Sequence, residues 1–291
     1  MKALYEFRID EGEAQQIFGP AFGRSLGAVR IIKLQADDPA FDELGQAHRE
    51  RLKRGRRAGV IYSWDVRRSY SRAELEQAEF IQFIPSGAFE PAGEDCGTSY
   101  DESTACPHCG AGRIQASLLA LDLRRNQPEH DIHTTTLRRG KDVARSIADE
   151  VVVSDRLATL FRGSEASGFE LAAVRKCDSN GLIEGWLQLH VTSHPVEATS
   201  PTTYGNNPFD LDEAGQYRCP LGHVAGLNLL TELTIDRGSW QGADIVATSQ
   251  LSGRRDGALV PAPALVITKR LYRVLRNSRV KGARYEVVHL A

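Results

Sequence analysis

One stretch of this sequence, Cys106–Arg175, occurs a second time, and this repetition constrains the fold more than any other feature. The segment CPHCG opens the first copy at 106–110, and CPLGH opens the second at 219–223, 113 positions later. Further on, EVVVSDRLATLFR and ALVITKRLYRVLR align at an offset of 114. The period is too long, and the copies are too few, for a solenoid. We therefore expect a duplicated unit of roughly 70 residues whose two copies share one core.

Charged and glycine residues recur at matching positions of the two copies. The matched pairs are Asp131 with Asp244, Arg156 with Arg270, and Gly168 with Gly282. A residue that both copies need is more typical of a shared turn, cap or hydrogen bond than of a single active site. We therefore interpret these residues as structural.

Each copy predicts the same order of elements after its Cys-Pro motif. An apolar run and a short strand come first, and β-branched strands at 151–153 and 265–267 follow. Ser154 or Thr268 can then cap a helix whose apolar residues recur at i, i+3 and i+4. A glycine turn and a last strand end each copy. This pattern predicts a strand-rich α+β fold.

Length and composition are those of an ordinary soluble protein. The 291 residues leave room for one large or two modest domains, and 41% of them are hydrophobic and 25% charged. A formal net charge of -2 gives no global attraction to nucleic acid or anionic lipid. No apolar run approaches the ~20 residues of a transmembrane helix. Acidic residues stand where a signal peptide needs an apolar region, so we expect a cytoplasmic protein without a membrane partner.

We expect four segments along the chain: an N-terminal α+β region at 1–90, the knuckle and first repeat copy at 91–176, a connector at 177–218, and the second copy at 219–291. Alternating apolar and polar residues predict a strand at 5–9 in the N-terminal region, and 29–32 and 62–66 are further candidate strands. Ser71 and Glu74 match a capping box, which predicts a helix that continues to Gln82. Pro and Gly residues between 85 and 94 mark the boundary that follows.

Two polar segments have more than one interpretation. The basic segment 48–57 is either a phosphate-binding patch or a solvated helix end. We favour the helix end, because no aromatic residue lies among its charges and nearby acids balance them. The loop 195–208 follows a predicted strand at 185–191 and is rich in turn-forming residues. It is either a binding surface or a connector, and the sequence does not separate the two.

The motif Cys-Pro-x-Cys-Gly at Cys106–Gly110 is typical of a zinc knuckle. Two thiolates hold one metal ion, while Pro and Gly shape the tight turn beneath the sulfur atoms. A structural zinc site needs four ligands. Cys96 and the Gly after it resemble the second half of another knuckle, but position 93 is Gly rather than Cys. Five cysteines with one tight C-x-x-C fit metal ligation in a reducing compartment better than a set of disulfides.

Three sets of ligands are compatible with this pattern. The candidate ligands are Cys96, Cys106, Cys109, Cys219 and His223. The set that we favour joins the first three cysteines to either Cys219 or His223. A second set leaves Cys96 free and uses the other four residues. A third set takes a local histidine, from among His108, His130 and His133. In the first two sets the metal joins the two copies, and such a closed site contributes folding free energy rather than an open catalytic position. Cys177 stands apart and is interpreted as a plain structural or surface thiol.

Catalytic chemistry has weaker support in the sequence. A three-ligand zinc ion with a bound water needs a general base nearby. Four acids close to the first knuckle are available, namely Glu94, Asp95, Asp101 and Glu102. The sequence contains no G-x-x-x-x-G-K-[ST] phosphate loop and no G-x-S-x-G nucleophile elbow.

The knuckle context TACPHCGAG, the segment VVVSDRLATLFRGSEASGFELAAVR and its counterpart LVITKRLYRVLRNSRVKGARYEVVHLA resemble a known family. The chain is similar to the double-CXXCG-motif proteins of myxobacteria and related immunity-protein-like families, over about residues 60–175 and, more faintly, 217–291. The resemblance implies a small cytoplasmic protein, and some members are thought to neutralise a partner toxin. The family's second motif has two cysteines before its Gly, whereas this chain has Cys96 alone or the pair Cys219 and His223.

We therefore expect a non-enzymatic, zinc-stabilised protein that binds another protein, as an immunity or antitoxin-like factor would. One alternative is a zinc-ribbon protein that binds nucleic acid, which would need a basic face with aromatic residues. The other is a zinc-dependent hydrolase, which would need an open metal position beside a carboxylate.

Overall fold

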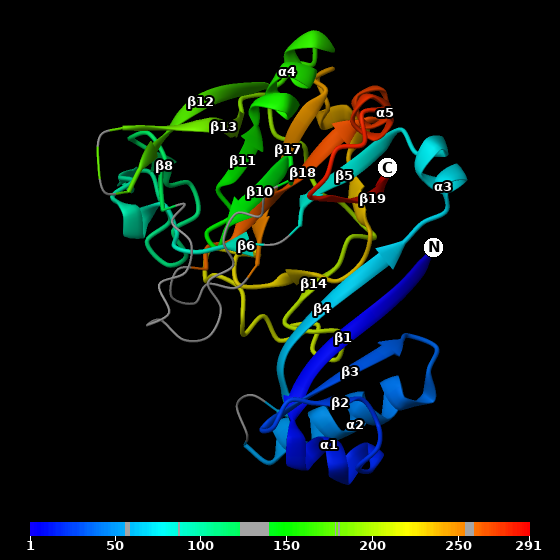
Figure 1. The fold of residues 1–291 in the computed structure, drawn as a ribbon. Helices are drawn as coiled ribbons and strands as arrows, with labels where there is room; N and C mark the ends of the chain where they lie inside the picture. Colours follow the sequence, from blue (N-terminus) through cyan, green and yellow to red (C-terminus); the bar gives the residue numbers. More distant parts are fainter. Residues whose placement is uncertain (56–58, 87, 123–139, 178, 180, 254–258) are drawn as a thin grey trace. The chain divides into compact units, whose positions relative to one another are not determined.

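The computed structural model describes residues 1–55, 59–86, 88–122, 140–177, 179, 181–253 and 259–291 (Figure 1). The chain forms two compact units. The smaller unit consists of residues 1–74 and 205–213, and the larger of residues 75–204 and 214–291. This division differs from the four segments that the sequence suggests, because strands outside the two repeat copies pair with strands inside them.

The smaller unit is a four-stranded sheet with two helices. Its strands are β1 (Lys2–Asp10), β2 (Arg24–Ser25), β3 (Val29–Gln35) and β4 (Ile61–Ser69), in the order β2-β3-β1-β4, and its helices are α1 (Glu11–Phe18) and α2 (Pro39–Lys53). All neighbouring strands run antiparallel. Phe7 of β1 and Ile32 of β3 are fully buried and pack in one cluster with Leu44 of α2. The three strands predicted in this region are present.

The segment 205–213 completes the core of the smaller unit. The Phe209 ring stacks on that of Phe7, with ring centroids 5.6 Å apart. The indole Nε1 of Trp64 donates a hydrogen bond to the backbone oxygen of Asn206, at 3.0 Å. The end of the loop whose role the sequence left open is therefore a structural part of this unit.

Helix α3 (Arg72–Gln77) is shorter than the sequence predicts. It begins with the expected capping box, because Glu74 N donates to Ser71 Oγ at 3.2 Å and Ser71 N donates to Glu74 Oε2 at 2.6 Å. The chain then enters strand β5 (Phe80–Pro85), so the prediction of a helix up to Gln82 is wrong. β5 is a central strand of a sheet, and this long-range pairing overrides the local helical spacing.

The two largest sheets of the larger unit have a matching order of strands, and Figure 1 labels most of their strands. The first sheet has the order β6-β10-β11-β13-β12-β9, and its strands are β6 (Ala88–Phe89), β9 (Ala120–Leu121), β10 (Val143–Ser146), β11 (Val151–Ser154), β12 (Phe169–Lys176) and β13 (Leu182–Val191). The second has the order β17-β18-β5-β19-β16, and its further strands are β16 (Leu233–Ile235), β17 (Ile245–Ser252), β18 (Ala262–Thr268) and β19 (Ala283–Leu290). The shorter elements are η1 (Glu94–Cys96), β7 (Tyr100–Asp101), β8 (Ile114–Gln115), β14 (Tyr204–Gly205), β15 (Asn228–Leu229) and η2 (Arg237–Ser239). The larger unit is thus strand-rich α+β, as the sequence predicts.

Each of these two sheets takes one inner strand from a distant part of the chain. β13 precedes the second knuckle but lies between β11 and β12 of the first sheet. β5 precedes the first knuckle but lies between β18 and β19 of the second sheet. The registers match as well, since Val152 lies opposite Gln188 and Val266 lies opposite Gln82. The two halves are therefore interlocked, because each holds an inner strand of the other's sheet.

Two helices follow equivalent strands and share one core. They are α4 (Asp155–Gly163) and α5 (Lys269–Asn277). Ser154 Oγ accepts from Leu157 N at 3.2 Å, and Thr268 Oγ1 accepts from Leu271 N at 3.4 Å, as the capping prediction requires. Leu157 and Leu271 are fully buried in one hydrophobic cluster that also contains Ile81 of β5. In the part of the chain that the structure describes, no helix is long and apolar enough to cross a membrane.

A buried aspartate precedes each helix and binds its arginine. Asp142 accepts from Arg156 Nε at 2.8 Å and from its Nη2 at 2.5 Å. Asp244 accepts from Arg270 Nε at 3.1 Å and also from its Nη2. These contacts correct the alignment made from sequence, which pairs Asp244 with Asp131, a residue outside the described part. The loop after β17 is longer than the loop after β10, so the offset between the halves changes within this hairpin.

The two halves also contact each other reciprocally near these aspartates. Asp142 accepts a hydrogen bond from the backbone N–H of Lys281 at 2.7 Å, and Asp244 accepts one from the backbone N–H of Ser167 at 3.2 Å. Gly168 follows Ser167 and has φ +92°, and Gly282 follows Lys281 and has φ +98°. Residues with a side chain rarely adopt this backbone conformation. A Cβ on either glycine would lie 2.2 Å or 2.3 Å from a backbone oxygen of the opposite half. Glycine is therefore required at both positions by the same close approach.

Candidate metal centre

The first knuckle is a tight turn that directs two sulfur atoms toward one point. Gly110 N donates to Cys106 O at 2.8 Å, and Cys106 N donates to Ala111 O at 2.7 Å. Gly110 has φ +71°, which explains why glycine follows the second cysteine. The backbone N–H groups of His108 and Cys109 donate to the Cys106 sulfur. The turn thus surrounds a thiolate position with backbone donors.

The second knuckle has similar local geometry around Cys219. Cys219 N donates to His223 O at 3.0 Å, and Gly222 N donates to Cys219 O at 2.8 Å. The Leu221 N–H points to the Cys219 sulfur at 3.4 Å. Gly222 has φ +84°, so the turn again needs a residue that tolerates the left-handed region. This turn places a thiol and an imidazole on the same side.

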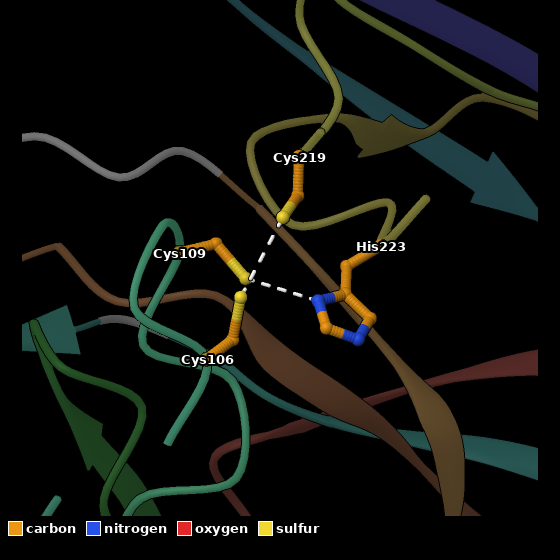
Figure 2. A group of neighbouring side chains, drawn as sticks. All are labelled: Cys106, Cys109, Cys219 and His223. Atoms are coloured by element: carbon orange, nitrogen blue, oxygen red, sulfur yellow. Dashed lines mark hydrogen bonds between the residues drawn. The ribbon is translucent and has the colours of Figure 1, made fainter. Parts of the chain in front are cut away.

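The two knuckles bring four side chains together, namely Cys106, Cys109, Cys219 and His223 (Figure 2). Their potential ligand atoms all lie within 4.8 Å of one another. The sulfur atoms of Cys106 and Cys219 are 3.6 Å apart, and the Cys109 sulfur is 3.3 Å from Nδ1 of His223. The three cysteines are buried, and His223 is exposed. A group of this composition and spacing can hold a metal ion, with two ligands from each half of the larger unit.

Cys96 lies outside this group. It is buried in the short helix η1, where burial and the neighbouring thiol of Cys177 raise its pKa. The set of ligands that we favoured from the sequence, with Cys96 as a member, therefore does not match the geometry, and the second set does. For the third set, His108 is not in the group, and His130 and His133 lie outside the described residues.

Packing explains why no second cysteine accompanies Cys96. A Cβ on Gly93 would lie 2.4 Å from Glu150 Oε1, so a cysteine side chain does not fit at this position. Gly93 N donates to both oxygens of Glu150, at 3.1 and 2.9 Å. The segment before the first knuckle is therefore anchored to a buried carboxylate rather than to a metal.

Glu150 is a residue that sequence reasoning did not single out. Besides Gly93, its carboxylate accepts from Tyr100 OH at 2.5 Å and from the hydroxyl of Ser146. Burial, together with the bond to Glu150, raises the pKa of Tyr100. In the aligned segments the second copy has Ala264 where the first has Glu150. A charge that replaces alanine at a core position was the signal that could have revealed this network.

The pKa values of Cys106 and Cys109 are shifted in opposite directions. Burial would raise the pKa of Cys106, but the backbone donors and the thiols of Cys109 and Cys219 outweigh it and lower this pKa. Burial raises the pKa of Cys109, and its contacts with the other two sulfur atoms raise it further. One thiol is thus poised to ionise while a neighbour retains its proton. A bound cation would favour the thiolate form of all three.

Two of the four acids near the first knuckle make contacts outside the group of ligands. Glu94 pairs with Arg113 at 3.1 Å, and Asp101 accepts from Ser103 N at 2.9 Å. Among the residues that the structure describes, no carboxylate belongs to the group of ligands. The arrangement therefore offers four ligands of the kind that zinc prefers, and the described part of the chain adds no carboxylate to this group.

No protein-family model matches this sequence, and no curated protein matches it either. The fold and the cysteine–histidine group are therefore the basis for assigning a function.

Proposed function

We propose that the chain is a non-enzymatic, zinc-stabilised protein that binds another protein. The observation that carries this proposal is the group of four ligands contributed equally by two knuckles 113 residues apart. Four ligands complete the tetrahedron of a structural zinc site and leave no position for a substrate. Zinc in this group would tie the two halves of the larger unit together and stabilise its fold.

Zinc is the metal that suits the donor set. Three thiolates and one imidazole form a Cys₃His set, which is typical of structural zinc. Soft thiolates disfavour calcium and magnesium, which take oxygen ligands. The backbone N–H donors around Cys106 and Cys219 stabilise negative charge on sulfur, as a zinc knuckle requires.

The larger unit also supports our inference of an internal duplication with exchanged strands. The pairs Val152–Gln188 and Val266–Gln82 occupy the same place in the two sheets. Two further hydrophobic clusters correspond in the same way. The cluster of the first sheet contains Phe89, Leu119, Leu121, Ala144, Val152 and Val174. The cluster of the second contains Val196, Leu233, Ile235, Val246, Val266 and Val288, and in addition Phe80. One ancestral unit, doubled and interlocked, accounts for both correspondences.

A protein partner fits what the knuckles expose. Leu221 lies between the ligands Cys219 and His223, and 62% of its surface is exposed. Ile114, just after the first knuckle, is 58% exposed. A large apolar side chain held in water on a rigid turn is a candidate anchor for a partner. The resemblance noted from the sequence suggests a toxin neutralised by this chain as one such partner.

The two rival functions have less support. A hydrolase would need an open metal position beside a carboxylate, and the group has four ligands without one. A nucleic-acid-binding face at 48–57 would need free basic side chains. Within the described part of this segment, His48 is buried, Arg51 pairs with Glu13 at 2.6 Å, and Arg54 lies 4.0 Å from Glu50.

Two measurements test the proposal together. Metal analysis of the purified chain should give about one zinc ion per molecule, because the group forms one tetrahedral site. A tagged chain should recover a protein partner from host lysate even after nuclease treatment. Leu221→Asp should abolish this recovery, whereas Leu182→Asp, at another leucine that is 52% exposed, should not. A metal-free, stable protein would contradict the zinc assignment, and equal recovery by both variants would contradict the anchor.

A further inference from the structure

The two cysteines outside the metal centre lie against each other. Cys96 is at the end of η1, and Cys177 follows the last residue of β12. The thiols are neighbours, and burial together with the Cys177 thiol raises the pKa of Cys96, although the residues are far apart in the sequence. Cys177 N donates to Leu121 O at 3.0 Å, and Cys96 N donates to Gly93 O at 3.0 Å, so backbone bonds fix both positions.

Neighbouring contacts hold the two segments together around these thiols. Ala120 N donates to the Thr98 hydroxyl at 2.9 Å, which attaches the turn after η1 to β9. Arg175 Nη2 donates to Gly97 O at 3.2 Å, which attaches the same turn to β12. The contact between the thiols is therefore part of a built junction of three segments.

The second half of the larger unit forms the same junction without sulfur. Thr234 N donates to the Thr202 hydroxyl at 2.8 Å, and Ala291 N donates to Ile235 O at 3.1 Å. Ser200 precedes Thr202 by two residues, as Cys96 precedes its threonine. Ser200 and Ala291 thus stand where the first half has its two cysteines. Because the backbone arrangement does not require thiols, their presence in one half calls for a chemical reason.

We propose that Cys96 and Cys177 are a redox pair that forms a reversible disulfide when the protein meets a peroxide. The proposal is independent of the metal and partner assignments, because it rests on residues outside the group of four ligands.

The exposure of the two thiols assigns their roles. Cys177 is partly exposed, whereas Cys96 is 4% exposed. Burial, together with the contact to Cys177, raises the pKa of Cys96 to about 12, so this thiol stays protonated in the reduced protein. Cys177 is therefore the residue that meets the oxidant, and Cys96 is the resolving thiol.

The reaction balances with hydrogen peroxide as the oxidant. The Cys177 sulfur attacks the peroxide, an S–O bond forms as the O–O bond breaks, and one water leaves with the thiol proton and the second peroxide oxygen. The Cys96 sulfur then attacks the sulfenic sulfur, an S–S bond forms as the S–O bond breaks, and a second water leaves with the Cys96 proton. Two thiols lose two electrons, and the peroxide is reduced to two waters. A small dithiol reverses the change by thiol–disulfide exchange.

The test is peptide mapping of the metal-loaded, full-length protein after brief treatment with one equivalent of hydrogen peroxide and blocking of free thiols. A linked peptide containing Cys96 and Cys177 should form, disappear after dithiothreitol, and leave the bound metal in place. Two variants copy the other half of the fold and should keep the protein stable, namely Cys96→Ser and Cys177→Ala. Cys177→Ala should lose all peroxide reaction at this site. Cys96→Ser should stop at a Cys177 sulfenic acid that a dimedone probe captures.

Other outcomes would overturn the proposal. One is oxidation of Cys106, Cys109 or Cys219, with release of the metal, before a disulfide forms between Cys96 and Cys177. Another is oxidation of Cys177 to a sulfinic acid without formation of the linked peptide. An unreacted Cys177 at this dose would overturn it as well.

Discussion

The paired aspartates allow a quantitative test of the two-half architecture. Asp142 accepts hydrogen bonds from Ser154, Lys281 and two nitrogens of Arg156. Asp142→Asn keeps the shape of the side chain but removes its charge and turns one acceptor oxygen into a donor. The carboxylate is 8% exposed, so the donors left behind are not fully rehydrated.

The cost follows from the bonds that asparagine cannot accept. Two of the hydrogen bonds are lost, each worth about 1.5–3 kcal/mol when the acceptor is charged. The Arg156 side chain is 50% exposed, so solvent weakens the hydrogen bond that it donates to Asp142. We therefore expect a loss of about 3 kcal/mol in the free energy of unfolding, or a Tm lower by about 6–12 °C for a unit of this size. Asp244→Asn should cost the same within error, because Asp244 is 10% exposed and bound to Arg270 in the same way.

The pH dependence provides a second readout. Burial opposes ionisation, but the bonds from Arg156 and Lys281 outweigh it and lower the pKa of Asp142, and Arg270 and Thr268 do the same for Asp244. A lowered folded-state pKa means that the stabilisation is present above the unfolded value of about 3.9 and is lost as pH falls through the folded value. The gap in Tm between the parent and either variant should therefore narrow in strong acid.

Thermal unfolding of the parent, the two variants and a control at several pH values measures these effects. Asp65→Asn is the control, because Asp65 is 52% exposed and lies 3.7 Å from Arg67 in a surface pair worth about 0–1 kcal/mol. Should one of the two buried aspartates prove dispensable while the other is essential, the equivalence of their contacts would be refuted.

Three further predictions concern the metal and the interlocked halves. Cys219→Ser should lower the zinc content below one ion per molecule and lower the free energy of unfolding of the larger unit by several kcal/mol, because structural zinc contributes about 10–16 kcal/mol in small domains. Metal analysis and calorimetry measure the two effects, and retention of zinc with an unchanged Tm would contradict this prediction. Gly168→Ala and Gly282→Ala should each lower the free energy of unfolding in urea by roughly 2–4 kcal/mol, because the added Cβ would clash with a backbone oxygen. Gly185 also has a positive φ, +83°, but no atom lies within 4 Å of an added Cβ, so Gly185→Ala should lower it by only about 1 kcal/mol. Two fragments made by dividing the chain just before β13 should copurify as a complex, because each fragment contains an inner strand of the other fragment's sheet. Two fragments that are each soluble and monomeric would contradict this strand pairing.

Local sequence was sufficient for features that a few neighbouring residues decide. The capping of α4 by Ser154 and of α5 by Thr268 depends on a hydroxyl three residues before a backbone N–H. The first knuckle likewise depends on Pro, Gly and two cysteines within five positions, and its motif predicted that Cys106 and Cys109 lie in the same group of ligands. The repetition of the second motif then pointed to Cys219 and His223 as further candidates.

Only the tertiary structure decided which candidates meet and which strands pair. Cys96 resembles a ligand in the sequence, but packing of Glu150 against Gly93 fixes its segment beside Cys177 instead. β5 reads locally as the end of a helix, and its place between β18 and β19 depends on residues almost two hundred positions away. The sequence by itself thus determined the fold class and the knuckle motifs, because turns, caps and periodicity act over a few residues. Strand exchange and the choice of ligands were decided by the tertiary structure, because they depend on burial and pairing between segments that local patterns do not connect.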